Sequence, residues 1–267
     1  MQGTGKGPGR GRLGTLVSFA AAATVMVYLS YALPSMLPGD FVTAMYAGSN
    51  VTLTAEQEAE LRSHYRGDEG FAAYVGRLLT LDWGYSYAFM TPVAGLFFEA
   101  LPWTLLLLGT AHLLSMTGGF VAGVETAWRS GGRSEKSLVG GMTFLEGVPE
   151  ISTGVLLLYV FGLQLNWFPV AGAETAYADG PALHRTVNIL HHLALPLATL
   201  TLAYLPGNFL LTRNSMIMVL RASYVDTARA KGLPPRRVRY AHAARNALLP
   251  LVTRFGLRLA FMITGAL

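Results

Sequence analysis

Long uncharged runs constrain this chain more than any other feature, because a helix needs about 20 apolar residues to cross roughly 30 Å of hydrocarbon. Charged residues make up only 13% of the sequence, about half the share of a soluble domain. The sequence therefore predicts an all-α polytopic membrane protein. Its five visible spans are expected at residues 16–33, 101–124, 138–163, 193–211 and 247–267.

Two of these runs carry a complication. The first follows Lys6, Arg10 and Arg12, as a signal peptide would, but four further runs favour an uncleaved anchor. The third contains Pro149, and a proline inside a helix removes a backbone hydrogen bond and bends the chain. We therefore expect a kinked third span.

Basic residues collect in alternate connections. The N-terminal tail, the connection around 129–136 and the loop 213–246 are rich in Lys and Arg, whereas 34–100 and 164–192 are rich in acids. An excess of Lys and Arg marks the cytoplasmic side, so the N-terminus is expected inside. The predicted divisions are a cytoplasmic tail (1–15), a first span (16–33), an extracytoplasmic segment (34–100) and a membrane core (101–267) that contains the cytoplasmic loop 213–246.

The outer segment 34–100 carries two helix signals. Thr54 precedes acidic residues in what would be a first turn, which is typical of a helix start, and this helix is expected to reach about His64. Residues 71–81 place apolar side chains at helical spacing. The sequence predicts a small extracytoplasmic helical insertion.

Residues 224–250, YVDTARAKGLPPRRVRYAHAARNALLP, have a form that topology alone does not explain. The first residues can form two helical turns, Gly232 permits the left-handed conformation that ends a helix, and two prolines can start a second helix at 236–245. A solvated basic loop accounts for the arginines but not for the small face expected from Ala228 and Ala230. We expect the first helix to fit a groove on a partner.

The segment DTARAKGL…RNALLP resembles the EAA loop of the permease subunits of bacterial ABC importers, and more narrowly their dipeptide/oligopeptide/nickel branch. Ala228, Ala230, Gly232, Leu249 and Pro250 stand at the positions of that pattern. The resemblance implies the type I ABC importer permease fold in a bacterial or archaeal cytoplasmic membrane. It extends through most of the chain, with LPGD at 37–40, LDWGYSY at 81–87, TPV at 91–93, EALPWTL at 99–105, LNWFPVAG at 165–172 and LTRNSM at 211–216.

The resemblance also implies partners and a substrate class. The pore would be built with a second permease, commonly a different chain, and driven by two ATPase subunits. An extracytoplasmic solute-binding protein would deliver peptides, nickel complexes or another small solute, and lipid would surround the spans. The coupling contacts with the ATPase are expected from Tyr224, Asp226, Ala228, Arg229, Ala230, Lys231, Gly232, Arg236 and Arg237.

The sequence contains no GxxxxGK[ST] phosphate-binding motif. We therefore expect ATP and Mg²⁺ to bind the partner ATPase, this chain to be no enzyme and to hold no cofactor, and no nucleic acid to bind. Two features depart from the family pattern. Ala222 and Ser223 stand where an acid often precedes the tyrosine, which puts one ATPase contact in doubt, and a sixth span is expected to be missing by truncation.

Four charged residues lie inside predicted spans. Glu146 and Glu150, and likewise Arg254 and Arg258, are four positions apart and so would share a helix face, at matching depths. A lone charge at the bilayer centre costs about 2.5–3.5 kcal/mol on insertion scales, which favours the pairs Glu146–Arg254 and Glu150–Arg258. The alternative is that these groups line the pathway and contact a charged substrate.

Two other interpretations stay open. A proton-coupled secondary transporter would use the membrane glutamates as a relay, but it leaves the 224–250 loop unexplained. A metal site is conceivable at His184, His191 and His192 beside Asp179. Adjacent histidines point in different directions on a helix, however, so an interfacial polar cap is favoured and no metal site is predicted.

Overall fold

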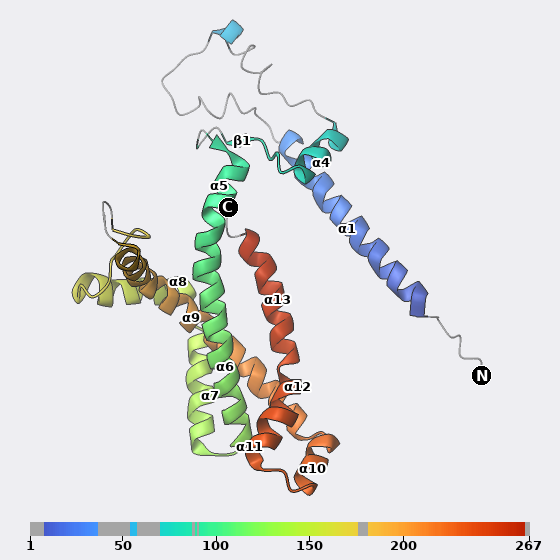
Figure 1. Ribbon diagram of the computed structural model, residues 1–267, viewed down its shortest axis with the longest axis vertical. Helices are drawn as coiled ribbons and strands as arrows, with labels where there is room; N and C mark the ends of the chain where they lie inside the picture. The colour runs from blue at the N-terminus through green and yellow to red at the C-terminus, as the bar shows by residue number, and fades with distance from the viewer. Residues whose placement is uncertain are drawn as a thin grey trace. The chain divides into compact units, whose positions relative to one another are not determined.

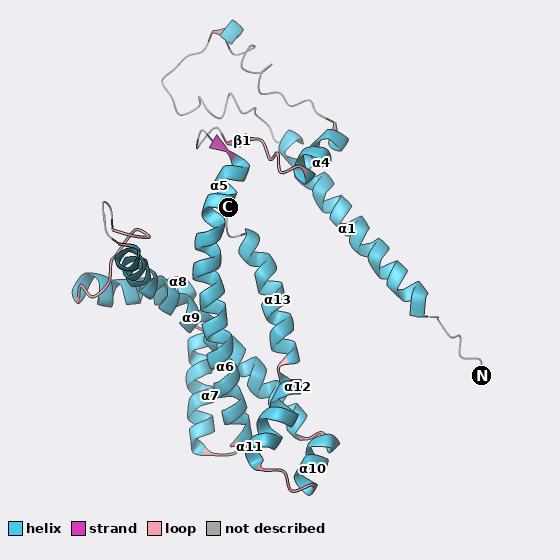
Figure 2. Cartoon of the chain, in the orientation of Figure 1, coloured by secondary structure: helices cyan, strands magenta, loops and turns pink. Residues whose placement is uncertain are grey.

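The computed structural model describes residues 8–36, 54–57, 70–86, 89, 91–175 and 181–264 (Figures 1 and 2). Helices dominate these residues, as predicted. The chain divides into two compact units, residues 1–94 and 95–267, and each is described by itself.

The first unit is built on α1 (Pro8–Met36), which contains the predicted first span. The helix begins inside the segment predicted as a cytoplasmic tail, and proline is favoured at a first helical position. Large apolar side chains along α1, such as Phe19 and Met26, are exposed. An exposed apolar helix of this length suits a lipid environment.

Aromatic contacts hold α4 (Phe71–Leu79) against α1. The Phe71 ring lies 5.4 Å from that of Tyr28 and 5.7 Å from that of Tyr31, and the Tyr74 ring lies 5.5 Å from that of Tyr31. Phe71 and Tyr74 belong to the stretch 71–81, whose helical spacing of apolar residues predicts this helix. The second outer helix is therefore confirmed, with its end at Leu79.

The other outer helix is described only at its start. The Thr54 amide donates to Gln57 Oε1 at 3.1 Å, and the Gln57 amide donates to Thr54 Oγ1 at 3.4 Å, which is a reciprocal capping box. Residues 55–57 are helical, and the predicted continuation to His64 lies outside the described residues. A short antiparallel pair, β1 (Tyr85–Ser86) and β2 (Thr91–Pro92), was not predicted.

The second unit contains the remaining predicted spans. Within the described residues, three helical stretches are long and apolar enough to cross a membrane: Leu13–Pro34 in the first unit, and Val93–Trp128 and Ala182–Leu220 here. The elements in chain order are α5 (Val93–Thr104), the π-helical η1 (Leu105–Gly109), α6 (Thr110–Trp128), α7 (Arg133–Glu146), α8 (Glu150–Leu157), the π-helical η2 (Leu158–Gln164), α9 (Ala182–Leu220), α10 (Ser223–Ala230), α11 (Pro235–Arg237), the π-helical η3 (Val238–Ala244), α12 (Arg245–Ala247) and α13 (Leu249–Thr264).

Close packing of α6 on α9 organises this unit. A Cβ added to Gly119 would lie 2.8 Å from Asn208 Cβ and from the Phe209 amide nitrogen, and one added to Gly123 would lie 2.8 Å from Thr212 Cβ. Two glycines four residues apart let helix backbones approach this closely. The GxxxG spacing at 119–123 was a readable signal for this helix pair.

The predicted third span is broken rather than merely kinked. α7 and the α8–η2 helix meet at 94°, with Gly147 ending the first and Pro149 preceding the second in an extended conformation, ψ 138°. The position of the bend was predicted from Pro149, and the structure makes it a break between two helices rather than a kink within one. The helix α13 lies within the fifth predicted span, but its 16 described residues, which end at Thr264, are fewer than the roughly 20 needed to cross the hydrocarbon, so this span stays a prediction.

The two predicted cytoplasmic connections of this unit lie at the same end. The α6–α7 connection and the segment α10–α12 meet there (Figure 1), and η3 packs against α6, α9 and α10. This arrangement agrees with the alternation of basic connections along the sequence.

Candidate functional site

The helix α10 has a defined start and a defined stop. The amide of Leu233 donates to the Ala228 carbonyl at 3.4 Å and that of Gly232 to the Arg229 carbonyl at 2.9 Å, which are the two bonds of a Schellman motif. Gly232 has φ +71°, as predicted, and that conformation favours glycine. The turn therefore fixes the direction in which the chain leaves α10.

The two faces of α10 differ. Val225 and Ala228 are buried, whereas the other residues from Ser223 to Ala230 are exposed, as are Lys231 and Gly232. The expectation that Ala228 contacts a partner is therefore wrong, because this residue packs inside its own chain. Ala230 does lie on the outer face. The exposed members of the predicted coupling set are Tyr224, Asp226, Arg229, Ala230, Lys231, Gly232, Arg236 and Arg237.

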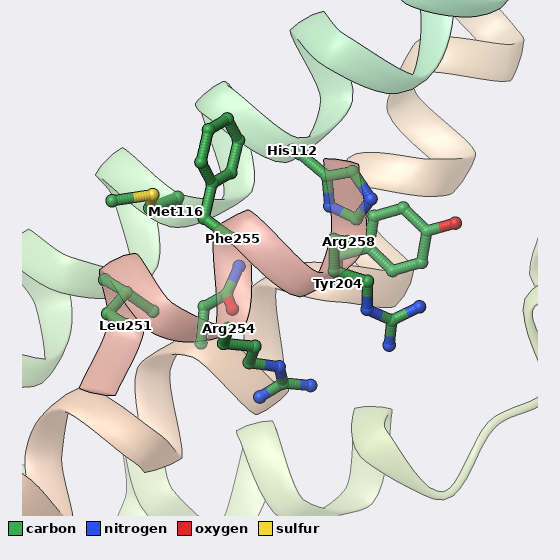
Figure 3. A pocket seen from close by; sticks show the side chains of 8 residues that line it. His112, Met116, Tyr204, Leu251, Arg254, Phe255 and Arg258 are labelled. Carbon is green, nitrogen blue, oxygen red and sulfur yellow. The ribbon is translucent and has the colours of Figure 1, made fainter. Parts of the chain in front are cut away.

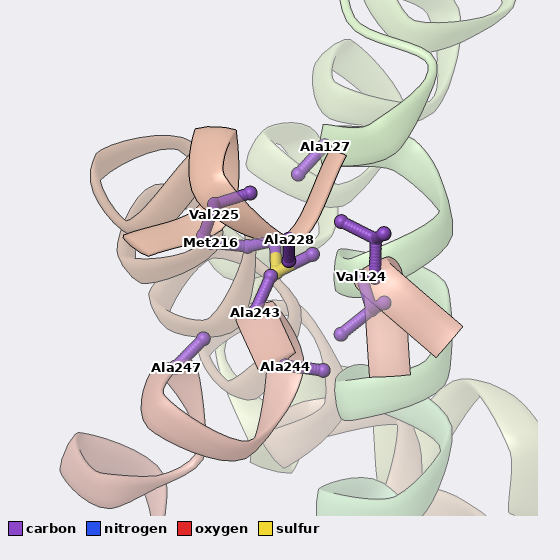
Figure 4. Packing of buried hydrophobic residues seen from close by; sticks show 9 residues of the cluster. Val124, Ala127, Met216, Val225, Ala228, Ala243, Ala244 and Ala247 are labelled. Atoms are coloured by element: carbon purple, nitrogen blue, oxygen red, sulfur yellow. The ribbon is translucent and has the colours of Figure 1, made fainter. Parts of the chain in front are cut away.

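A small-residue cluster anchors the inner face of α10 (Figure 4). Val225 and Ala228 pack with residues of α6, α9, η3 and α12, and Leu233 lies against the same cluster. The small alanine side chains let these elements approach closely, so that several elements pack against the inner face of α10. The other buried members are Val124, Ala127, Met216, Val238, Ala243, Ala244 and Ala247.

Ionic and aromatic contacts surround this cluster. Arg239 Nη1 donates to Glu125 Oε2 at 2.7 Å, and the Tyr240 hydroxyl donates to Glu125 Oε1 at 2.6 Å. The hydrogen bond to this carboxylate raises the pKa of Tyr240 above its ordinary value. The Trp128 ring lies 5.5 Å from the guanidinium carbon of Arg239 and 5.8 Å from that of Arg229, within cation–π range. α6, α10 and η3 are thereby tied together.

A second ion pair joins α7 to α9. Both Arg213 Nε, at 3.1 Å, and Arg213 Nη2 donate to Glu135 Oε1, and Glu135 Oε2 accepts the Gly131 amide. The side chains of Glu135 and Arg213 are 8% and 21% exposed. We call Glu125, Glu135, Arg213 and Arg239 the cytoplasmic frame. Its acids were missed because counting Lys and Arg for topology ignores single glutamates.

At membrane level, side chains of α6, α9 and α13 meet around a small pocket (Figure 3). The His112 imidazole stacks on the Tyr204 ring with centroids 4.4 Å apart. The Arg258 guanidinium carbon lies 5.4 Å from the centroid of the same ring. Arg254 and Arg258, one turn apart on α13, extend to the same side of that helix.

The two intramembrane glutamates lie on different helices. Glu146 ends α7 and Glu150 begins α8, so the break removes the shared helix face that their spacing predicts. Within the part of the chain that the structure describes, no ion pair joins either glutamate to Arg254 or Arg258. The pairs Glu146–Arg254 and Glu150–Arg258 are therefore not formed in this structure and stay a prediction. We call these four residues the membrane-level cluster.

Comparison with known proteins decides the family. Residues 115–267 match the family described as binding-protein-dependent transport system inner membrane component. The chain belongs to this family. It is 32% identical over 260 residues to the oligopeptide transport system permease protein AppB of Bacillus subtilis, covering 94% of this chain and 79% of the relative.

Two further relatives agree. The identity is 33% to the di/tripeptide transport system permease protein DppB of Pseudomonas aeruginosa, covering 96% of this chain and 80% of the relative. It is also 33% to the probable peptide ABC transporter permease protein y4tP of Sinorhizobium fredii, covering 94% and 78%. This chain is therefore an inner-membrane permease subunit of a binding-protein-dependent ABC importer, with the type I permease fold. Such a subunit works with a partner permease, an ATPase and a solute-binding protein.

The histidines of the permease's outer connection have backbone partners. His191 Nε2 lies 2.9 Å from the Trp167 carbonyl oxygen, and His192 Nδ1 lies 3.0 Å from that of Asn188. These contacts fit the interfacial polar cap expected from the sequence. Asp179 lies outside the described residues.

Proposed function

We propose that this permease translocates peptides and that the exposed face of α10 is the coupling surface for the ATPase. The observation that supports coupling is the burial of one face of α10 in the small-residue cluster, while the other face is exposed. A helix held in this way can transmit a push from a partner to α6 and α9 without detaching. ATP and Mg²⁺ then bind the partner ATPase.

Peptides are the substrate class that the relatives favour. The names of the three relatives above refer to oligopeptide, di/tripeptide or peptide transport, and none of the three refers to nickel. We infer that this permease pairs with a second, different permease around one pathway. Uptake that requires ATP and survives collapse of the proton gradient would separate this function from proton-coupled transport.

The coupling surface is tested by reversing one exposed charge. Lys231→Glu, directly after α10, is expected to lower both peptide uptake and ATP hydrolysis stimulated by the binding protein about fivefold, because a reversed rim charge weakens docking by about 1 kcal/mol. Both rates are measured in the reconstituted transporter. Lys136→Glu, the same change at an exposed position on α7, is the control. Equal rates for the two variants would refute docking through α10.

The second part of the proposal is that the membrane-level cluster lines the pathway. Glu146, Glu150 and Arg258 are exposed, and ionisable groups within a membrane face a protein interior or a water-filled cavity rather than lipid. Among the described residues, no ion pair joins these groups to one another. We therefore propose that these exposed side chains face the translocation pathway rather than lipid.

Thiol labelling tests this assignment, because the native sequence has no cysteine. Glu150→Cys and Arg258→Cys in the assembled transporter are expected to react with a water-soluble methanethiosulfonate. Ile151→Cys, the next position on α8, is the control and should stay unreactive, because its side chain points to another side of the helix. Failure of both test positions to react above this control would exclude them from the pathway.

A further inference from the structure

In the membrane-level cluster, Glu146 and Arg254 have opposite charges and lie close together. A Cβ at Gly207 of α9 would lie 2.8 Å from Arg254 Nη2 and 3.0 Å from Glu146 Oε1. Both side chains therefore reach the same side-chain-free point on α9, from α13 and from the end of α7. Within the part of the chain that the structure describes, they nevertheless form no ion pair.

The glycine makes this convergence possible. A Cβ at position 207 would lie within 3.0 Å of the ends of both side chains, so the guanidinium or the carboxylate would have to shift. A carboxylate and a guanidinium that serve only to join two helices are expected to be in direct contact, because charges within a membrane are stabilised by pairing with one another. The separation of this pair leaves hydrogen-bonding capacity on both groups for a third molecule.

A second cation is held beside the first. The Tyr204 ring contacts both the Arg258 guanidinium and the His112 imidazole. The contact with the ring helps to orient Arg258. Arg254 and Arg258 extend to the same side of α13 (Figure 3). Two guanidiniums so placed suit a carboxylate, which Arg can bind through two parallel hydrogen bonds.

We propose that the membrane-level cluster is a binding site for a zwitterionic solute, with Arg254 and Arg258 taking a carboxylate and Glu146 taking an ammonium group. A short peptide with free ends has both groups. This inference rests on the proposed function, since it names the part of the peptide that the pathway contacts. Neither an anion nor a cation alone would use both signs of charge.

Neutral amides at both positions separate a ligand site from a structural pair. Glu146→Gln, Arg254→Gln and the double variant are reconstituted with the ATPase, partner permease and binding protein, and uptake of trialanine is measured beside binding-protein-stimulated ATP hydrolysis. Each single change is expected to lower uptake about tenfold, the value of one charge-assisted hydrogen bond, and the double variant further still. ATP hydrolysis should change less than twofold.

The opposite pattern identifies an ion pair that only holds helices. Removing both partners together is then nearly neutral, because no buried charge is left alone, so the double variant would recover uptake that each single variant loses. Recovery of that kind, or single variants with full uptake, overturns the site. If the unmodified complex neither hydrolyses ATP in response to the binding protein nor takes up trialanine, the proposed function itself fails, which is a distinct result.

Discussion

The cytoplasmic frame and the membrane-level cluster lie in the same unit, but among the described residues the charged side chains are paired in the frame and unpaired in the cluster. In the frame, Glu125 bonds Arg239 and Glu135 bonds Arg213, and Glu135 is nearly buried. In the cluster, no described ion pair involves any of the four charges, and three of them are exposed. The frame thus has its partners inside this chain, whereas the cluster does not.

The medium makes this difference informative. At the cytoplasmic end water could solvate unpaired charges, yet there the chain pairs them. At membrane level an unpaired charge is expensive, yet there the chain leaves them apart. We infer that the frame stabilises the fold around α10. The cluster would instead bind charged groups of another molecule.

The largest expected effect tests the frame. Glu135→Ala leaves Arg213, whose side chain is 21% exposed, without its partner and should lower the free energy of unfolding by about 3 kcal/mol. Thermal unfolding of the purified permease in detergent measures the loss.

The matched change in the cluster is Glu150→Ala, also in the first turn of a helix. This change should alter the free energy of unfolding by less than about 0.5 kcal/mol, because Glu150 is exposed and a water-filled pathway would solvate its carboxylate. Equal losses for the two variants would show that the cluster is as structural as the frame, and the contrast drawn above would then disappear.

Local sequence signals predicted much of the fold. Uncharged runs located the spans, the amphipathic stretch at 71–81 located α4, and Gly232 with the following prolines located the end of α10. These signals act over a few residues, so one sequence suffices to read them. The size of the 94° break at Pro149 was not predictable, because proline sets where a helix bends and packing against α9 sets how far.

The orientation of side chains and long-range pairs were harder. Ala228 and Ala230 were assigned to one face, although two positions on a helix differ by about 200°. The buried pair Val225 and Ala228, three apart, marks the inner face. Glu125 finds its partner 114 positions away and Glu135 78 positions away, distances at which no local pattern carries information.

The next prediction compares the buried face of α10 with its exposed face. Ala228→Leu adds volume to a packed cluster, where the relative exposure of Ala228 is 4%, and should cost about 2 kcal/mol of unfolding free energy. Ala230→Leu, on the exposed face, should cost less than about 0.5 kcal/mol while still reducing peptide uptake. Unfolding in detergent and uptake by the reconstituted transporter are measured on both. A stable Ala228→Leu variant would mean that the inner face is loosely held.

The smallest effect distinguishes backbone strain at Gly232 from contact between Gly232 and a partner. Gly232 has φ +71° and no atom within 4 Å of a Cβ placed on it, so Gly232→Ala should cost about 1 kcal/mol through conformation alone. Gly232→Asn, larger but more tolerant of the left-handed region, should cost less when unfolding of the permease is measured. If peptide uptake shows the reverse order, with asparagine worse than alanine, then a partner fills the space beside Gly232 in the assembled transporter. Stability and uptake would then rank the same two variants differently, which a solvated loop cannot produce.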